Sequence, residues 1–396
     1  MSRSRIVFLI VSLFLVVPMI AATFVYAADR GKPDQKGDSL FKYVGVFTEV
    51  LNLVRQTYVD ETDTNALMAS ALDGTTEALD AFSQYVPAPA VSRYLEVQKV
   101  GTKRSGLHLV KDNGIVYVVA IDADGPAKKA GVEIGDIVVE AAGKDAHRAP
   151  FWEIEETFAG EPGTKIPLRL LRLGETRVVT CELAEFTPPA PSLERIEGLP
   201  VLHLSSFGER TAWATRGALA QLKATKAEDR LIVDLRGIAG GDPEAAYAVA
   251  RLFTQGDLGA LVGRKGQIST FTGSEAPVWK GSRLVVLVDR GTLGAAELLT
   301  TVLVQKLHAE VVGERTFGYA GRLASADLSS GGRLIYTDAF YAGPDRKPLD
   351  AALQPDVPVD ERSRTFEDKD TPLDDLILKQ GLRRLVAEPE AAKKAA

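Results

Sequence analysis

The feature that most constrains the fold is an alternation of short apolar runs and helical segments in the second half of the chain. Residues 284–288 are apolar at every position and residues 231–235 at all but one. Strands with this composition are buried on both faces, as in parallel sheets. Three stretches with the apolar spacing of helices lie among these runs, at 211–225, 243–253 and 295–306. The pattern predicts an α/β core, with helices covering a mixed sheet.

The N-terminus has the pattern of an export signal. Arg3 and Arg5 precede an uncharged stretch over residues 6–28, which ends in Val-Tyr-Ala at 25–27. A basic start, an apolar run and a small-x-small site predict a secretory signal that is cleaved after Ala27. The alternative is an uncleaved span, because the run is just long enough to cross a bilayer. Both interpretations place the body of the chain outside the cytoplasm, in the periplasm or cell envelope, and the second anchors it in the inner membrane.

Charge and cysteine content exclude several classes of protein. The chain has 47 basic and 53 acidic residues and a net charge of −6, without basic blocks. This balance argues against a protein that binds nucleic acid. A single cysteine, Cys181, excludes an intramolecular disulfide and a cysteine-rich metal site. His108, His147 and His203 are isolated from one another in the sequence, so we expect neither a metal nor another cofactor.

Shifts in composition divide the chain into segments. Residues 29–39 are polar and contain glycine and proline, which predicts a linker. Helical spacing then runs to about residue 95, and short alternating strands follow it up to residue 187. A proline-rich stretch, TPPAP at 187–191, separates this part from the α/β core. The predicted units are a helical N-terminal unit, a β module, the core, and a C-terminal helix with a tail, at 40–95, 96–187, 192–361 and 362–396.

The β module resembles a PDZ domain. Its segment GPAKKAGVEIGDIVVE at 125–140 has the small-Pro-Ala, Ala-Gly and Gly-Asp elements of the PDZ signature in register. PDZ domains bind an extended peptide by adding it to a sheet edge. The resemblance places the loop that binds the peptide carboxylate at Ser105, Gly106, Leu107, His108 and Leu109. The alternative is a β module that binds nothing and serves as a spacer.

Nearly the whole chain after the signal resembles the carboxyl-terminal processing, or tail-specific, serine proteases. The motifs that carry the resemblance are YVD at 58–60, LD at 79–80, SQY at 83–85, LSSF at 204–207, VDLR at 233–236, VGERTFG at 312–318 and QPDV at 354–357. The resemblance implies a serine nucleophile at the start of a helix, a lysine base 25 residues later and an orienting glutamine four residues further on. It also implies that the amides of Gly240 and Gly241 form an oxyanion hole.

All three catalytic positions carry other residues in this chain. Alignment on Glu297 places Gly294 at the nucleophile, Tyr319 at the base and Leu323 at the orienting position. Glycine supplies no nucleophile, and a phenol with a pKa near 10 is a poor base at neutral pH. The spacing is kept and the functional groups are lost, so we expect a catalytically degenerate member of the family. The hydroxyl of Thr292, two residues before Gly294, is the one weak candidate for a substitute nucleophile.

Three functions remain open at the level of sequence. The first is an exported pseudoprotease that binds polypeptide C-termini or unfolded segments through the PDZ module and the empty cleft, as an adaptor or regulator. Its expected partners are further copies of itself, an active protease or another envelope protein, with membrane contact only through the N-terminal segment. The second is an active serine-type endopeptidase with a non-standard nucleophile. The third is an envelope protein whose fold only presents an interaction surface.

Overall fold

The computed structural model describes residues 35–100, 104–222, 229–361, 365–366 and 375–387. The predicted signal over residues 1–28 lies outside these ranges. No helix within them combines the length and apolar character that crossing a membrane requires. The chain divides into two compact units between Ala69 and Ser70, inside helix α3 (Thr64–Glu77).

The first unit contains helix α2 (Gln35–Thr57). This helix begins inside the segment 29–39 that the sequence predicts as a linker. Proline disrupts the interior of a helix, and the proline of this segment, Pro33, lies before the first residue of α2. The polar residues that follow it are compatible with a helix. The predicted linker therefore extends too far, by the residues from Gln35 to Ser39.

The PDZ-like module is an antiparallel sheet with strand order β2-β3-β4-β6-β7, and a short strand, β5, pairs with β4. Helices α5 (Pro126–Ala130) and α6 (Phe151–Thr157) belong to the same module. The strands are β2 (Leu107–Asp112), β3 (Ile115–Ile121), β4 (Ile137–Ala141), β5 (Lys144–Asp145), β6 (Lys165–Arg172) and β7 (Glu175–Glu182). Phe158, Leu168 and Leu170 are fully buried in its core.

A six-stranded sheet with order β17-β14-β13-β10-β9-β8 forms the centre of the core. All neighbours are parallel except β8, which is antiparallel to β9. The strands are β8 (Ser192–Ile196), β9 (Leu199–His203), β10 (Arg230–Asp234), β13 (Arg283–Val288), β14 (Glu310–Gly313) and β17 (Val357–Pro358).

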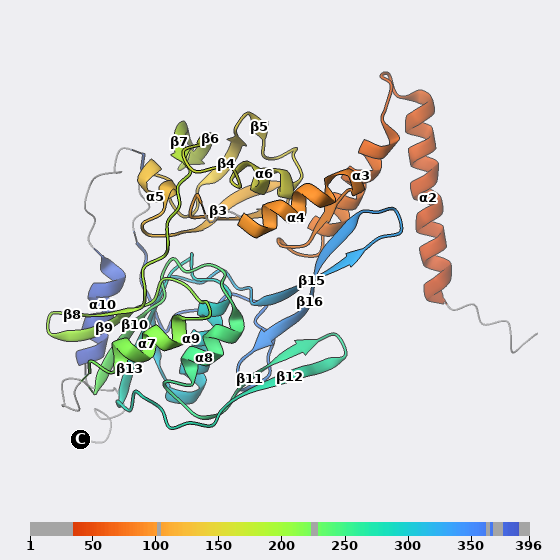
Figure 1. The fold of residues 1–396 in the computed structure, drawn as a ribbon. Helices are drawn as coiled ribbons and strands as arrows, with labels where there is room; N and C mark the ends of the chain where they lie inside the picture. The colour runs from red at the N-terminus through yellow and green to blue at the C-terminus, as the bar shows by residue number, and fades with distance from the viewer. Residues whose placement is uncertain (1–34, 101–103, 223–228, 362–364, 367–374, 388–396) are drawn as a thin grey trace, which may run out of the picture. The chain divides into compact units, whose positions relative to one another are not determined.

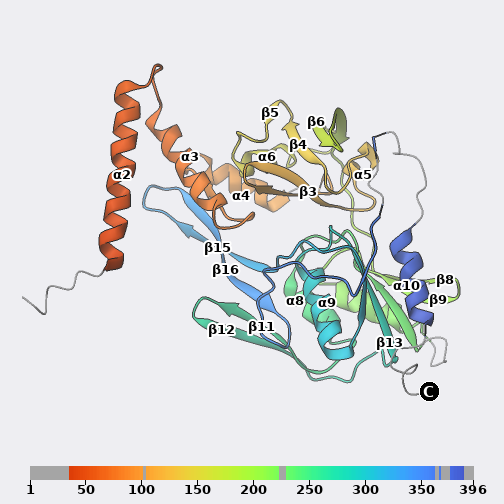
Figure 2. The same ribbon diagram turned by 180° about the vertical axis from the view of Figure 1, so that it is seen from behind.

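Both faces of this sheet are covered by helices, as Figures 1 and 2 show. Alternate residues of a strand point to opposite faces. Leu231 and Val233 accordingly pack in a cluster with three helices: α7 (Thr211–Leu219), α8 (Pro243–Ala250) and α9 (Ala295–Leu307). Ile232, between them, packs in a separate cluster with α10 (Leu376–Val386). The predicted α/β core with covering helices is confirmed.

A third sheet, which the sequence analysis does not predict, has the order β1-β16-β11-β12, with β15 also paired to β16. Its strands are β1 (Gln84–Val86), β11 (Gly256–Gly263), β12 (Gly266–Gly273), β15 (Gly321–Asp327) and β16 (Arg333–Ala342). β1 lies inside the segment 40–95 predicted as helical, before a short 3-10 helix (Ala88–Ala90) and α4 (Val91–Val100). Three residues are too few to show a strand's alternation, so the sequence pattern misses it.

Candidate functional site

The position that the resemblance assigns to the nucleophile lies directly before helix α9. Gly294 has φ 66° and ψ −111°, a backbone conformation that L-residues rarely adopt. A Cβ atom built at this position would lie 3.6 Å from the carbonyl oxygen of Tyr319 and 4.0 Å from the amide nitrogen of Gly240. A small side chain would therefore fit, and it would lie beside the amide of Gly240. The structure brings positions 240, 294 and 319 together, as the resemblance implies.

Tyr319, at the position of the base, is held by an aromatic cluster. Its ring stacks on Phe82 with centroids 3.9 Å apart and meets Phe340 edge-on at 5.7 Å. Its hydroxyl shares a hydrogen bond of 2.7 Å with the hydroxyl of Thr337. Burial raises the pKa of Tyr319 to about 12, although the Thr337 hydrogen bond opposes the rise. At neutral pH the phenol is therefore even less available as a base than that of a free tyrosine.

Leu323, at the orienting position, lies on β15 and pairs in register with Thr337. Its side chain is 47% exposed. It offers no polar atom with which to orient a base.

Glu297 joins the two principal catalytic positions. Its carboxylate is 1% exposed, and one oxygen accepts from the amides of Gly294 at 3.0 Å and Tyr319 at 2.9 Å. The other oxygen accepts from the amide of Gly318 at 2.7 Å and from the hydroxyl of Thr316. Burial raises the pKa of Glu297, while these four donors oppose the rise. The sequence analysis uses Glu297 only for alignment. Its place as an acidic residue in the first turn of an otherwise apolar helix is the signal that could have identified it.

Thr292 is fully buried and its hydroxyl is engaged on both sides. It donates toward the carbonyl oxygen of Leu235 at 3.1 Å and lies 3.0 Å from a carboxylate oxygen of Asp289. The Asp289 amide donates to the same hydroxyl at 3.0 Å. No lysine or histidine contacts it in the part of the chain that the structure describes, and the Asp289 carboxylate beside it already accepts from the amides of Gly237 at 2.9 Å and Gly291 at 3.0 Å.

Comparisons with known proteins identify two regions of the chain. Residues 105–183 match the PDZ domain family, and residues 199–359 match peptidase family S41. These two matches, together with the relatives below, support a carboxyl-terminal processing protease family with an S41 core and a PDZ domain.

Its curated relatives are distant but cover most of the chain. The carboxy-terminal-processing protease of Bartonella bacilliformis is 24% identical over 90% of this chain and 83% of that protein. The carboxy-terminal processing protease CtpA of Bacillus subtilis is 25% identical over 94% of this chain and 83% of that protein. A probable CtpA-like serine protease of Staphylococcus haemolyticus is 24% identical over 76% of this chain, which spans 62% of that protein.

A solved structure shares the fold. The photosystem II D1 C-terminal processing protease superposes with a TM-score of 0.65 and 24% identity, over 86% of this chain and 97% of that one. This match and the two family matches confirm the predicted combination of a protease-like α/β core and a PDZ module.

In this chain, the PDZ module packs against the loops that carry the candidate site. Val110 of β2 and Val119 of β3 share an apolar cluster with Ala239 and Leu293, the residues immediately before Gly240 and Gly294. Gly291 lies so close to the module that a Cβ atom there would come within 2.8 Å of Ile134. The PDZ module and the loop before position 294 are therefore in direct contact.

The loop that the PDZ resemblance assigns to a peptide carboxylate precedes β2. Ser105 and Leu107 are fully buried, and the amide of Leu107 already donates to the hydroxyl of Ser105 at 3.2 Å. Gly106 has φ 70°, which the turn requires. Leu109 is buried, and His108 is partly exposed and lies 3.2 Å from a carboxylate oxygen of Asp122.

The glycines assigned to the oxyanion hole form a turn after β10. Gly240 and Gly241 have φ 74° and 86°, and a Cβ atom on Gly241 would come within 2.7 Å of the carbonyl oxygen of Phe207. Only glycine fits at 241 without a shift of the backbone. The turn thus accounts for both glycines without a catalytic role.

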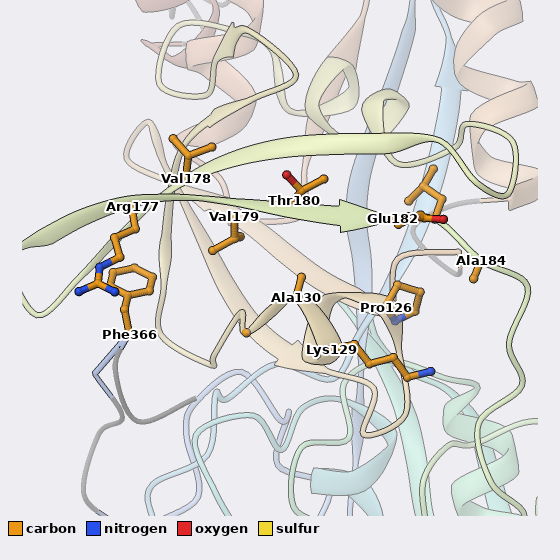
Figure 3. A pocket seen from close by; sticks show the side chains of 12 residues that line it. Pro126, Lys129, Ala130, Arg177, Val178, Val179, Thr180, Glu182, Ala184 and Phe366 are labelled. Carbon is orange, nitrogen blue, oxygen red and sulfur yellow. The ribbon is translucent and has the colours of Figure 1, made fainter. Parts of the chain in front are cut away.

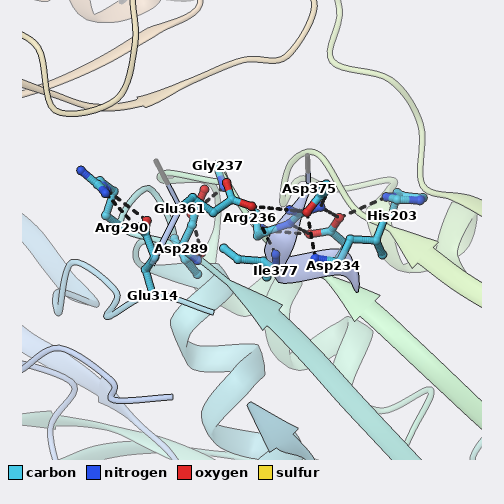
Figure 4. A network of polar contacts seen from close by, with 12 residues as sticks. His203, Asp234, Arg236, Gly237, Asp289, Arg290, Glu314, Glu361, Asp375 and Ile377 are labelled. Carbon is cyan, nitrogen blue, oxygen red and sulfur yellow. Dashed lines mark hydrogen bonds and ion pairs between the residues drawn. The ribbon is translucent and has the colours of Figure 1, made fainter. Parts of the chain in front are cut away.

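A network of charged groups ties the carboxyl end of β10 to helix α10 (Figure 4). Arg236 donates to both oxygens of Asp234, at 2.9 and 2.8 Å, and to both of Asp375, at 2.7 and 3.0 Å. Burial opposes ionisation of Asp234, but hydrogen bonds from Arg236 and His203 hold its pKa well below the usual range. Because Asp375 also caps α10, this network fixes the start of the C-terminal helix. Within the described residues, no group of three histidine, cysteine or acidic side chains is placed to hold a metal ion.

Proposed function

We propose that this protein is an exported, catalytically inactive member of the carboxyl-terminal processing protease family, which captures polypeptide without cleaving it. The observation that carries the proposal is the glycine at position 294. A serine-type peptidase needs a hydroxyl there, and the space that a side chain would occupy, 4.0 Å from the amide of Gly240, contains none.

The surrounding groups support the same conclusion. The Tyr319 phenol hydrogen-bonds to Thr337 and has a raised pKa, and Leu323 is apolar. The hydroxyl of Thr292 is held by hydrogen bonds with Leu235 and Asp289, and no lysine or histidine among the described residues contacts it. Loss of a serine nucleophile alone lowers turnover by about a million-fold. The bonds of the buried Thr292 hydroxyl to Leu235 and Asp289 hold it within the loop, which argues against the alternative of an endopeptidase with a substitute nucleophile.

The architecture of the PDZ module supports the binding part of the proposal. The PDZ module keeps its sheet and its helices, and it contacts the loops at Ala239 and Leu293. A polypeptide end bound by the module would lie next to the emptied cleft and remain intact. An adaptor or regulator that holds a substrate for an active protease fits this combination.

Export and self-association are part of the proposal. The uncharged stretch after Arg3 and Arg5 supports export. Helix α2 exposes a series of large apolar side chains, which supports pairing with another copy or another protein: Leu40, Phe41, Tyr43, Val44, Val46, Phe47, Val50 and Leu53.

The test is a cleavage assay with an unstructured protein such as casein, followed by mass spectrometry. We expect no cleavage by the natural chain and no labelling by a serine-directed covalent probe. The triple variant Gly294→Ser, Tyr319→Lys, Leu323→Gln should regain cleavage, because the amide of Gly240 still lies beside position 294. The double variant without Gly294→Ser is its matched control and should stay inactive.

Cleavage by the natural chain that disappears in Thr292→Ala would overturn the proposal in favour of a substitute nucleophile. Binding of the same unstructured protein is measured in parallel. If the chain neither cleaves nor binds it, a purely structural protein is the better description.

A further inference from the structure

A groove on the PDZ module has none of the residues 105–109 and not position 294 in its lining, although its Ala184 end adjoins that loop. It runs between helix α5 and strand β7 and has a volume of about 580 Å³ (Figure 3). Pro126, Lys129 and Ala130 line it from α5, and the second half of β7 lines it from the other side. Its size is within the range of sites that hold several side chains of a ligand.

Strand β7 is the edge of its sheet. The strand order ends at β7, so no strand among the described residues pairs with its outer edge. Most of its side chains are exposed, and Val178 is 61% exposed. An unpaired edge strand beside a helix is the arrangement with which PDZ domains add a peptide as a further strand. β7 lies at the end of the strand order opposite to β2, so the module has a second sheet edge there.

One end of the groove already holds an aromatic side chain of this chain. The ring of Phe366 lies 4.2 Å from the guanidinium carbon of Arg172 and 5.2 Å from that of Arg177. Asp136 fixes Arg172 through two hydrogen bonds of 2.6 Å, which leaves the flat face of its guanidinium to the ring. Arg172 also donates to the carbonyl oxygen of Thr365 at 3.3 Å. Arg172 and Arg177 thus contact an aromatic ring, and Arg172 also contacts the backbone just before it. We call this position the aromatic seat.

The charge of the groove indicates what accompanies the aromatic residue. Lys129, Arg177 and Glu182 are its charged lining residues. Glu182 pairs with Lys165 at 3.7 Å, whereas Lys129 has no ion pair among the described residues and its neighbour Lys128 pairs with Glu133 at 2.9 Å. In the sequence, Phe366 is followed by Glu367 and Asp368. An aromatic residue followed by acidic residues therefore matches both the seat and the cation.

We propose that the groove between α5 and β7 is a second peptide-binding site, which takes an extended segment of a partner protein with an aromatic residue followed by acidic residues. Phe366 is the internal occupant of the aromatic seat, and the partner's aromatic residue displaces it. This inference does not depend on whether the core cleaves peptides.

The experiment measures binding of a fluorescent peptide, acetyl-Val-Thr-Phe-Glu-Asp-Val-amide, to the full chain by anisotropy. Phe366→Ala should bind it about tenfold more tightly than the natural chain, because the internal competitor is gone. When the Phe of the peptide is replaced by Ala, Phe366→Ala should no longer bind it more tightly than the natural chain does. In the Phe366→Ala background, Lys129→Glu should weaken binding about threefold or more, and the matched control Lys128→Glu should not.

Three results would overturn the inference. The peptide could bind the natural chain and Phe366→Ala with equal affinity, or its affinity could be unchanged when its Phe is replaced by Ala. The third is that Lys129→Glu and Lys128→Glu weaken peptide binding equally. Circular dichroism verifies that each variant is folded. If Phe366→Ala does not fold, the inference is tested on the natural chain. Its affinities for the peptides with and without Phe are compared, and Lys129→Glu and Lys128→Glu are made in the natural chain.

Discussion

A buried carboxyl group on helix α6 predicts an unusual pH dependence of stability. Burial raises the pKa of Glu155 from 4.5 to about 7, although hydrogen bonds with Gln84 and Gln98 lower it in part. The second oxygen of the Glu155 carboxylate and the side-chain oxygen of Gln84 are both buried and have no hydrogen-bond partner among the described residues. A protonated Glu155 is a donor, and Gln84 next to it offers the acceptor. The folded protein therefore favours the neutral form of Glu155.

The sign and the size of the effect follow from this pKa. Between pH 4.5 and about 7 the folded state holds a proton that the unfolded state releases, so the free energy of unfolding falls as the pH rises. Below this window Glu155 is protonated in both the folded and the unfolded state. Above it Glu155 is ionised in both states, and the folded state is destabilised by the full free energy of holding a buried carboxylate. A rise in pKa of this size corresponds to roughly 3 kcal/mol.

The assay is urea denaturation at pH 5, 6, 7 and 8, followed by tryptophan fluorescence. Trp152 lies on the same helix, is 2% exposed and reports on this region directly. We expect Glu155→Gln to remove most of the fall between pH 5 and 8 and to be more stable than the natural chain at pH 8. Glu153→Gln, on the same helix, is the matched control and should keep the fall. An unchanged pH profile in Glu155→Gln would refute the assignment.

Three further predictions concern the site around position 294 and helix α2. Glu297→Ala leaves four donors without their acceptor and should lower the free energy of unfolding by about 3 kcal/mol or more; a loss below about 1 kcal/mol in urea denaturation would contradict this. Gly294→Ala should cost about 1–2 kcal/mol because of its φ of 66°, and should leave polypeptide binding unchanged; weaker binding would show that the side chain blocks the cleft. Phe47→Asp should reduce self-association in light scattering, since Phe47 is 40% exposed on α2, and the polar-site control Asn52→Asp should not.

The parts of the fold that could be predicted are those with long or repeated patterns. The apolar runs at β10 and β13 and the helices beside them follow from burial on both faces, and the glycines of the PDZ segment mark its turns. In the third sheet, the pairings of β16 with β1 and with β11 escape prediction because they join segments far apart in sequence. β1 pairs with β16, near the other end of the chain, and neither strand indicates its partner.

The candidate site could be placed by spacing but not in its contacts. Residue identity alone decides that Gly294, Tyr319 and Leu323 carry no serine, lysine or glutamine side chain. The sequence does not predict that Tyr319 stacks on Phe82, because that contact depends on tertiary packing. Nor does it show that Glu297 connects positions 294 and 319, since a hydrogen-bond acceptor is recognised only when its donors have been placed.

The position of α10 has a consequence for how the chain reaches its folded state. One face of the central sheet is covered by helices that lie between its strands in the sequence, but the other face receives Ile377, Leu382 and Leu385 from α10. During synthesis this face stays open until residue 386 has been added, so every shorter intermediate exposes Ile232, Leu287 and their neighbours to water. Such surfaces promote aggregation. A chain that stops before α10 is therefore expected to be insoluble rather than merely shortened, and the period just before its completion is when the protein most needs protection.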